Sequence, residues 1–302
     1  MKRILITGLN SYIGTNVDRY LKEYNALQEE EHYQVDRISQ KESTWESKDF
    51  SVYDTILDVT GIAHADVARV SPEEKENYYR VNCDLAVKTA QKAKAEGVKQ
   101  FIYLSSIIVY GDSAPVGKKK QITADTIPEP ASFYGDSKLQ AEKGLEFLEN
   151  ESFKVAIVRL PFVYGKESKG NYRVMVKLAH RLPIFPTIPN KRSMIYIENL
   201  NEFLRILIEQ QSGGLWFPQN AEYGTTVEMV REIATAHQKK ILFCDWLNPI
   251  IKLLSKFPGK IGKLTNKAFG NLTYDWSMSE EMKGYCIYSM KDSIEKTEGK
   301  RD

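Results

Sequence analysis

The chain has 302 residues, 42% of them hydrophobic and 27% charged, which suits one large domain or a domain with a smaller lobe. Its net charge of +2 excludes the electrostatic footprint of a nucleic-acid-binding protein, and no apolar run reaches the roughly 18 residues of a membrane span. Cys83, Cys244 and Cys286 are far apart and match no metal spacing, so we expect reduced thiols and no metal site.

The chain begins Met1-Lys2-Arg3 and then enters an apolar strand, without the pattern of a signal peptide, so we expect a cytoplasmic protein. That first strand, at residues 4–6, leads through a glycine-containing turn into a helical pattern that extends to Leu21. This order places backbone N–H groups at a helix N-terminus, where they can bind a pyrophosphate; an ordinary strand-to-helix turn is the alternative. The predicted cofactor contacts in the turn are Gly8, Asn10, Ser11, Tyr12, Ile13 and Gly14.

Ser11 departs from the usual dinucleotide fingerprint, which has a glycine at the middle of its three positions. Serine is small enough to allow close approach of a ligand. It would nevertheless be strained if the backbone required a positive φ at this position.

The second predicted strand, residues 32–38, ends at Ser39 and Lys41 without a carboxylate. An acidic side chain at that place commonly binds the adenosine ribose of NAD and would repel the extra phosphate of NADP. We therefore expect NAD or NADP as the cofactor, with a slight preference for NADP and with Ser39 as a contact. The start of a surface loop is the alternative interpretation.

Residues 41–53 are polar and lack a helical period, so the usual crossover helix is expected to be missing or reduced. Residues 55–64 then predict a third strand, whose end carries small residues that let a flat cofactor lie against the backbone. The expected contacts there are Thr60, Gly61 and Ile62, and His64 is a further candidate.

The next stretch, residues 73–96, predicts a helix that Gly97 ends and whose core face Asn82 interrupts. Further strands are expected from residue 98 to the serines at 105 and 106 and over residues 154–160, with a helix from Tyr134 to about residue 150 between them. Alternating strands and helices predict an α/β fold with a Rossmann-like, doubly wound parallel sheet. Ligands bind at the carboxyl ends of such strands.

Tyr134 and Lys138 are the residues around which we build the chemistry, because residues four apart lie on one face of a helix. A nearby ammonium favours the ionised phenol, so we expect Lys138 to lower the pKa of Tyr134 and make it a usable acid or base. Ser106 could bind the same substrate oxygen. A tyrosine four residues before a lysine also arises by chance, so the pair gains its meaning from the motifs that precede it.

These motifs together resemble the extended short-chain dehydrogenase/reductases, in the NAD-dependent epimerase/dehydratase group that acts on sugar nucleotides. The resemblance covers nearly the whole chain. It is carried by Thr7-Gly8…Gly14, Gly61-Ile62-Ala63, Asn82, Ser106…Tyr110-Gly111, Tyr134…Lys138 and Arg159-Leu160-Pro161-Phe162-Val163-Tyr164-Gly165.

The resemblance implies an NAD(P)-binding Rossmann domain at residues 1–165, with a returning segment at about 190–215. A smaller C-terminal substrate-binding lobe would comprise about 166–190 and 216–302. It implies Ser106, Tyr134 and Lys138 as catalytic residues, with Lys138, Asn82 and Pro161 also beside the cofactor. Asn171 and Arg192 would hold the diphosphate of a UDP- or dTDP-sugar, since an arginine fork pairs two phosphate oxygens. A homodimer packed through the Tyr134 helix is also implied.

The reaction implied is hydride transfer at a hexose carbon, C4 by preference, in a 4-epimerase or a 4-keto-sugar reductase of surface-polysaccharide synthesis. Similar dehydratases carry an Asp-Glu pair where this chain has Ile107 and Ile108, which cannot move protons, so dehydration is not expected. Phe162 stands where many 4-epimerases have an asparagine. A non-catalytic NAD(P)-binding regulator or scaffold of the same fold is the alternative.

Residues 241–263 mix leucines, isoleucines and lysines and predict a basic amphipathic helix that Pro258 and Gly259 end. We expect this helix to pack on the protein's own core. Contact with a membrane surface is the alternative, and neither a membrane nor a nucleic acid is expected as a partner.

Overall fold

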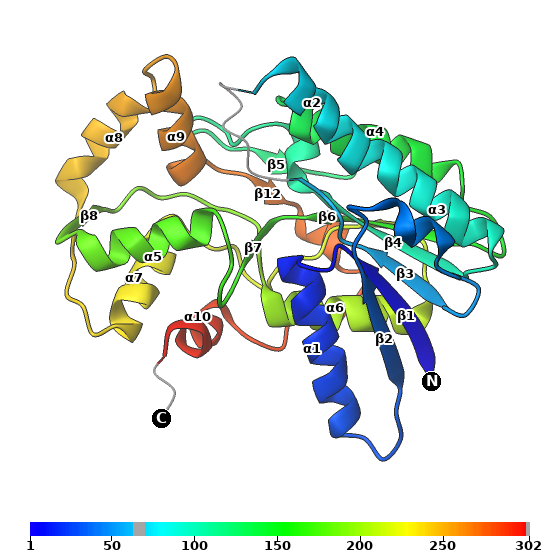
Figure 1. Cartoon of the computed structure of the whole chain (residues 1–302). Coiled ribbons are helices and arrows are strands. Elements are labelled where there is room, and N and C mark those ends of the chain that lie inside the picture. Colours follow the sequence, from blue (N-terminus) through cyan, green and yellow to red (C-terminus); the bar gives the residue numbers. More distant parts are fainter. Residues whose placement is uncertain (63–69, 300–302) are drawn as a thin grey trace. The chain divides into compact units, whose positions relative to one another are not determined.

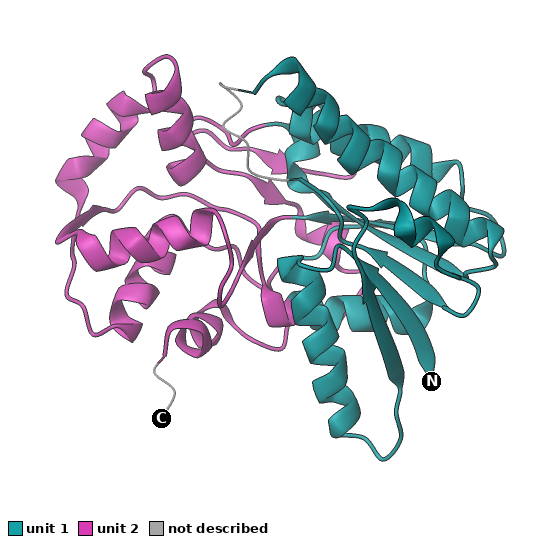
Figure 2. Cartoon of the chain, viewed as in Figure 1, with its two compact units in different colours: residues 1–111, 127–160, 200–218 teal, residues 112–126, 161–199, 219–302 magenta. Residues whose placement is uncertain are grey.

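The computed structural model describes residues 1–62 and 70–299, and the chain divides into two compact units (Figure 2). Unit 1 comprises residues 1–111, 127–160 and 200–218, and unit 2 comprises residues 112–126, 161–199 and 219–302. The sequence placed its boundaries near residues 165, 190 and 215. The cofactor and substrate roles given to the predicted domains stay predictions.

Unit 1 is built on a six-stranded sheet, parallel throughout, with the strand order β10-β6-β4-β3-β1-β2. The α/β, Rossmann-like fold expected from the alternation of strands and helices is therefore confirmed. The strands are β1 (Lys2–Thr7), β2 (Tyr33–Ile38), β3 (Thr55–Asp58), β4 (Gln100–Ser106), β6 (Lys154–Leu160) and β10 (Gly214–Trp216).

Helices cover both faces of this sheet, with α1 and α6 on one face and α2, α3 and α4 on the other (Figure 1). The hydroxyl of Tyr20 on α1 donates a hydrogen bond of 2.8 Å to Glu202 on α6, and alanines of α3 and α4 pack with strand side chains in one core. The helices are α1 (Tyr12–Ala26), α2 (Pro72–Tyr79), α3 (Leu85–Ala95), α4 (Phe133–Glu146) and α6 (Ile197–Gln210), which begins in unit 2.

A π-helical turn at Arg80–Asp84 joins α2 to α3, so the helix predicted over residues 73–96 contains one wider turn around Asn82. The hydroxyl of Tyr103 on β4 donates a 2.7 Å hydrogen bond to the carbonyl of Asn82. Gly97, at a φ of +81°, follows the end of α3 as predicted.

The connection before β3 and the strand β3 itself are both short. Residues 41–53 contain a 3₁₀ helix, Ser43–Ser47, in place of a crossover α-helix, in agreement with their polar sequence. Strand β3 ends at Asp58 and residues 59–62 are not in a strand, so the strand predicted over residues 55–64 is too long. Ala63 and His64 lie outside the described residues.

Unit 2 contains three two-stranded parallel pairs, β5 with β12, β7 with β9 and β8 with β11, and several helices. The strands are β5 (Gln121–Ile122), β7 (Phe162–Tyr164), β8 (Ile184–Pro186), β9 (Met194–Tyr196), β11 (Leu242–Cys244) and β12 (Thr273–Tyr274). The helices are α5 (Asn171–Arg181), α7 (Thr226–Ala236), α8 (Asn248–Leu254), α9 (Lys260–Phe269) and α10 (Met290–Glu298).

The single helix predicted for residues 241–263 is wrong. The segment is divided into β11, a short 3₁₀ turn, α8 and the start of α9, and Gly259, at a φ of +77°, caps α9 instead of ending a helix. The expected packing on the protein's own core is also only half right, because Leu253 and Phe257 are exposed. None of the helices in the described ranges has the length and apolar character needed to cross a bilayer.

Candidate functional site

Two glycines shape the turn between β1 and α1. Gly8 has a φ of +74°, where an L side chain is strained, and a Cβ added to it would lie 3.2 Å from the backbone nitrogen of Thr60. A Cβ on Gly14 would lie 2.9 Å from Val59, so glycine allows α1 to pack closely against the sheet. These are two of the physical demands of a dinucleotide-binding turn.

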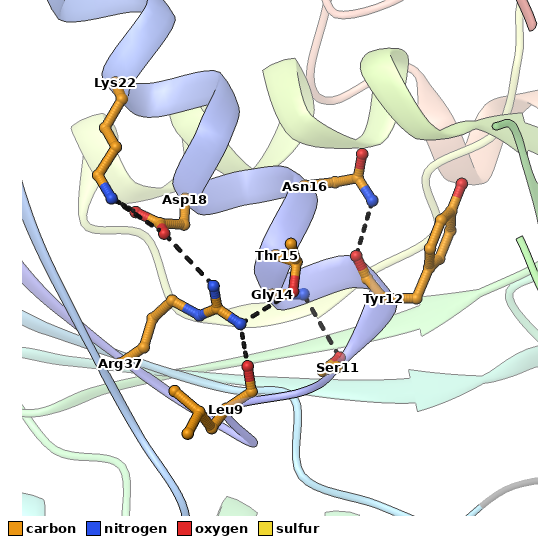
Figure 3. Close-up of polar contacts among 9 residues, drawn as sticks. All are labelled: Leu9, Ser11, Tyr12, Gly14, Thr15, Asn16, Asp18, Lys22 and Arg37. Carbon is orange, nitrogen blue, oxygen red and sulfur yellow. Dashed lines mark hydrogen bonds and ion pairs between the residues drawn. The ribbon is translucent and has the colours of Figure 1, made fainter. Parts of the chain in front are cut away.

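Ser11 fits this turn without strain. Its φ of −68° and ψ of 135° are ordinary extended values, and its hydroxyl accepts a 3.4 Å hydrogen bond from the backbone N–H of Gly14 as the N-cap of α1 (Figure 3). Asn10 is exposed, and Tyr12 and Ile13 are half-buried in the first turn of the helix. The positive end of α1 therefore lies at the turn, where a phosphate would be stabilised.

Arg37 on β2 holds the turn in place, and the sequence interpretation missed it. Its guanidinium donates to the carbonyl of Leu9, donates a 2.9 Å hydrogen bond to Thr15 and lies 3.5 Å from a carboxylate oxygen of Asp18 (Figure 3). An arginine one residue before the end of β2, beside the turn in a parallel sheet, was the available signal.

The end of β2 offers a hydroxyl and a cation in place of a carboxylate. Ser39 is half-buried, and Lys41 is exposed. Gln40 between them is buried, accepts a 2.6 Å hydrogen bond from the hydroxyl of Thr60 and donates one of 2.7 Å to Thr89. Gln40 therefore ties the ends of β2 and β3 together, which fixes the position of Thr60.

Helix α4 brings Tyr134 to the end of β4. Ser132 caps the helix by accepting a 3.2 Å hydrogen bond from Gly135, and the side chains of Tyr134 and Ser106 are hydrogen-bonded to each other. A Cβ on Gly135 would lie 2.8 Å from the carbonyl oxygen of Ile108. Glycine at this position thus lets the first turn of α4 approach the chain that follows β4, which allows the contact between the two hydroxyls.

The pKa of Tyr134 differs from the expectation. Burial raises it to about 12, and the hydrogen bond with Ser106 lowers it only in part. The prediction that Lys138 acidifies Tyr134 is wrong for this arrangement. The amine of Lys138 instead donates a 2.9 Å hydrogen bond to the carbonyl of Leu104 and lies 4.5 Å from the centre of the Tyr103 ring.

Lys138 is a buried cation near two buried carboxylates. Desolvation lowers its pKa to about 8, against the opposing effects of Asp58 and Glu142. Asp58 accepts hydrogen bonds from the hydroxyl of Thr7 and from the backbone of Thr60, and burial raises its pKa. The sequence interpretation missed both carboxylates, although Glu142 follows Lys138 by one helical turn, the same spacing that linked Tyr134 to Lys138.

Asn82 and Gly61 fix the chain after β3. The fully buried amide of Asn82 accepts a 2.7 Å hydrogen bond from the N–H of Ile62, and it donates 3.1 Å bonds to the carbonyl of Ile62 and to Ser137 on α4. A Cβ on Gly61 would lie 3.2 Å from the Asn82 amide oxygen and 3.3 Å from the Lys138 nitrogen. The predicted residues Gly61, Ile62, Asn82 and Lys138 therefore lie together.

Pro161, Asn171 and Arg192 belong to unit 2 and are described with it. Pro161 is buried and precedes Phe162, the first residue of β7. Asn171 is the first residue of α5, whose N-cap, Gly170, has no side chain to satisfy the free N–H groups. This helix end could therefore stabilise an anion.

Arg192 is only 8% exposed, and desolvation lowers its pKa to about 10. Its guanidinium donates a hydrogen bond to the carbonyl of Lys267 on α9, and its backbone pairs with Gly224 and Leu272. Within residues 1–62 and 70–299, no carboxylate forms an ion pair with it. A buried charge without a counter-charge is costly, so this position is suited to an anionic ligand.

Comparisons with known proteins identify epimerases among the relatives of this chain. The chain is 29% identical over 311 residues to UDP-glucose 4-epimerase of Vibrio cholerae, covering 94% of this chain and 90% of that protein. It is 25% identical over 224 residues to N-acetyl-alpha-D-glucosaminyl-diphospho-ditrans,octacis-undecaprenol 4-epimerase of Escherichia coli O157:H7, covering 70% of this chain and 64% of that protein.

The fold is also that of UDP-glucuronic acid 4-epimerase of Bacillus cereus in complex with NAD, with a TM-score of 0.72, 17% identity and coverage of 98% and 95% of the two chains. Other structures of this fold hold NADP or NADPH. The expected membership of the extended short-chain dehydrogenase/reductase superfamily is confirmed by the family model together with these relatives. Within it the chain belongs to the RmlD substrate binding domain family, which it matches over residues 1–252.

Proposed function

We propose that the chain is an NAD(P)-dependent 4-epimerase or 4-keto reductase of a sugar nucleotide, with Tyr134 as its proton-transfer residue. The observation that carries this proposal is the proximity of the Ser106 and Tyr134 side chains at the carboxyl edge of the parallel sheet. Lys138 follows one turn later on the same helix. The likeness to a UDP-glucose 4-epimerase over 94% of the chain supports the same reaction class.

Ser106 would hold the reacting oxygen of the sugar while Tyr134 moves its proton. In an epimerisation Tyr134 would take the proton of the C4 hydroxyl, and in a reduction it would give a proton to the C4 carbonyl oxygen. Because its pKa is about 12, Tyr134 is protonated at neutral pH in the free protein, which suits the donating role. A bound nicotinamide would supply the hydride acceptor or donor.

The residues around the glycine turn fit a dinucleotide. Gly8, Gly14 and Gly61 stand where an added Cβ would meet protein atoms within about 3.3 Å, so glycine at these positions lets the turn, α1 and the chain after β3 pack closely together. Gly8 to Gly14 would hold the pyrophosphate, and the segment at Thr60–Ile62 would lie against the cofactor. Ser39 and Lys41 support the preference for NADP, because a cation at that place favours a phosphate.

The substrate diphosphate is assigned to Arg192 and Asn171 of unit 2. Arg192 is a buried cation that ion-pairs with no carboxylate among the described residues, and Asn171 begins a helix without a side-chain cap. The same two groups suit a nucleoside diphosphate and the polyprenyl diphosphate named for the Escherichia coli relative. Both substrate classes therefore belong in the test, and the homodimer stays a prediction.

The experiment is to incubate the purified chain with NAD or NADPH and a panel of UDP-hexoses, 4-keto sugar nucleotides and polyprenyl-diphosphate sugars. Wild-type protein should convert at least one, and Tyr134→Phe should lose about 100-fold or more in turnover while still binding NADPH by fluorescence. Tyr79→Phe is the matched control, because the Tyr79 hydroxyl donates to Asp136 and is given no role in the reaction.

Binding of NADPH without conversion of any of these sugars would favour the non-catalytic alternative. Equal turnover of Tyr134→Phe and Tyr79→Phe would refute the role of Tyr134 even if the chain is an enzyme. Identification by mass of the nucleotide released from the purified protein would distinguish NAD from NADP.

A further inference from the structure

The segment that contains α8 and α9 in unit 2 exposes large apolar side chains in sequence succession. Ile250 and Leu253 lie three residues apart on α8, and Ile261 and Leu264 lie three apart on α9, so each pair shares one face of its helix. Trp246 is 62% exposed, Leu253 59% and Leu264 56%. The complete set is Trp246, Ile250, Leu253, Phe257, Ile261 and Leu264.

The same segment concentrates positive charge. Between residues 246 and 274 the sequence contains five lysines and no aspartate or glutamate, although the whole chain has 42 basic and 40 acidic residues. All five are exposed. They are Lys252, Lys256, Lys260, Lys263 and Lys267.

Hydrogen bonds and ring packing hold this segment against the rest of unit 2. Asn266 on α9 donates a 3.1 Å hydrogen bond to the carbonyl of Ser255 and accepts one of 3.0 Å from the N–H of Val116. Phe269 is buried, with its ring centre 5.9 Å from that of Phe185. The apolar face therefore belongs to a built structure, and its exposure is a property of the fold.

We propose that this face, hereafter the α8–α9 face, docks on an anionic lipid bilayer. A contiguous exposed apolar patch marks an interaction surface. Large apolar side chains beside lysines match the interfacial zone of a bilayer, where the apolar groups enter the acyl boundary and the ammonium groups meet lipid phosphates. The buried centre of a protein–protein interface is instead depleted in lysine.

The docking face is linked to the proposed anion site, since the guanidinium of Arg192 is hydrogen-bonded to the carbonyl of Lys267 on α9. A bilayer held by α9 would therefore lie near the residue assigned to the diphosphate. The docking proposal itself does not depend on which reaction the chain performs.

The test is co-sedimentation of the full chain with vesicles. Wild-type protein should bind vesicles of mixed phosphatidylcholine and phosphatidylglycerol, and bind far less to phosphatidylcholine alone or at high salt. Leu253→Glu and Leu264→Glu should each weaken binding by about tenfold or more, and Lys256→Gln and Lys263→Gln by about five-fold each. Leu27→Glu, at a position 83% exposed in unit 1, should change nothing.

Absence of binding to the anionic vesicles would overturn the proposal, as would an equal loss in Leu27→Glu and Leu253→Glu. Light scattering after gel filtration tests whether a second copy of the chain covers the α8–α9 face instead. If Leu253→Glu converts a dimer to a monomer and the wild-type protein does not bind vesicles, the face is an interface between two copies and the lipid proposal is wrong. Circular dichroism should show that each variant keeps the wild-type fold, as expected for exposed positions.

Discussion

Each compact unit buries a cation to which the proposed function gives a role, Lys138 in unit 1 and Arg192 in unit 2, and the two cations have different surroundings. Lys138 in unit 1 lies near Asp58 and Glu142, which oppose the lowering of its pKa by burial. For Arg192 in unit 2, desolvation is the whole cause of the lowered pKa. The first charge has carboxylates nearby, although Glu142 is itself ion-paired with Arg159, whereas the second has no carboxylate partner among the described residues.

This difference indicates what each unit can bind. A lysine with internal counter-charges can hold uncharged hydroxyl groups, such as those of a ribose, without needing an anion. A buried arginine without a carboxylate gains most from a ligand that brings its own negative charge. The contrast therefore supports the assignment of the cofactor sugar to unit 1 and of the diphosphate to unit 2.

The largest expected effect concerns Lys138 and pH. Its pKa is about 8 in the folded chain against 10.5 ordinarily, so between these values the unfolded chain binds more protons and stability rises with pH. The rise should be on the order of 3 kcal/mol. It should vanish in Lys138→Met and persist in Lys143→Met, an exposed lysine of the same helix, when urea unfolding is measured from pH 7 to 10. Parallel curves of stability against pH for wild type and Lys138→Met would mean that burial does not destabilise the charged form of Lys138.

Arg192→Met tests the second buried cation, the one in unit 2. We expect the affinity for UDP to fall about 10- to 100-fold, because charge-assisted hydrogen bonds to the phosphates are lost. The free protein should be as stable as wild type or more stable, since an unpaired buried charge is removed. Calorimetric titration and thermal melting measure the two effects. Lys191→Met, at the exposed neighbouring position, should alter neither quantity. Unchanged UDP binding in Arg192→Met would refute the assignment of the diphosphate to Arg192.

Gly135→Ala tests how tightly the unit 1 site is built. The added methyl group would lie 2.8 Å from the carbonyl oxygen of Ile108, so overpacking should cost about 1 to 3 kcal/mol of stability and reduce turnover by displacing Tyr134. Gln140→Ala, at an exposed position of α4, should be neutral. Wild-type turnover in Gly135→Ala would mean that the proximity of Ser106 and Tyr134 is not needed.

The smallest effect is expected at the glycine turn. Ser11→Gly restores the usual fingerprint and should lower stability by only a few tenths of a kcal/mol, whereas Ser11→Ala, which also loses the cap, should cost about 1 kcal/mol. NADPH affinity should be nearly equal in the wild type and Ser11→Gly. A large gain in affinity on restoring the glycine would show that the serine obstructs the cofactor.

The sequence predicted what depends on local pattern. The turn from Gly8 to Gly14, the alternation of strands with helices and the helix that carries Tyr134 and Lys138 all follow from short-range periodicity. The direction of the Lys138 amine could not be predicted, because Leu104 and Asp58 approach it from other strands. The break between α8 and α9 depends on tertiary support around Asn266, which hydrophobic spacing does not reveal.

The π-helical turn at Arg80–Asp84 has a consequence for tolerance to deletions. In an α-helix each residue advances the side chains by about 100°, and the wider turn contains one residue more than an α-helical turn would. The wider turn takes up the rotation of its extra residue, so removing a single residue there would leave a uniform α-helix in which Tyr78 keeps its direction. Tyr78 should still pack edge-on against Phe133, whose ring centre lies 4.8 Å away. The loss would fall on the bulge itself, where Asn82 is hydrogen-bonded to the N–H of Ile62 and to Ser137. One codon lost at this point should disturb the chain after β3 more than the packing of α2 on α4.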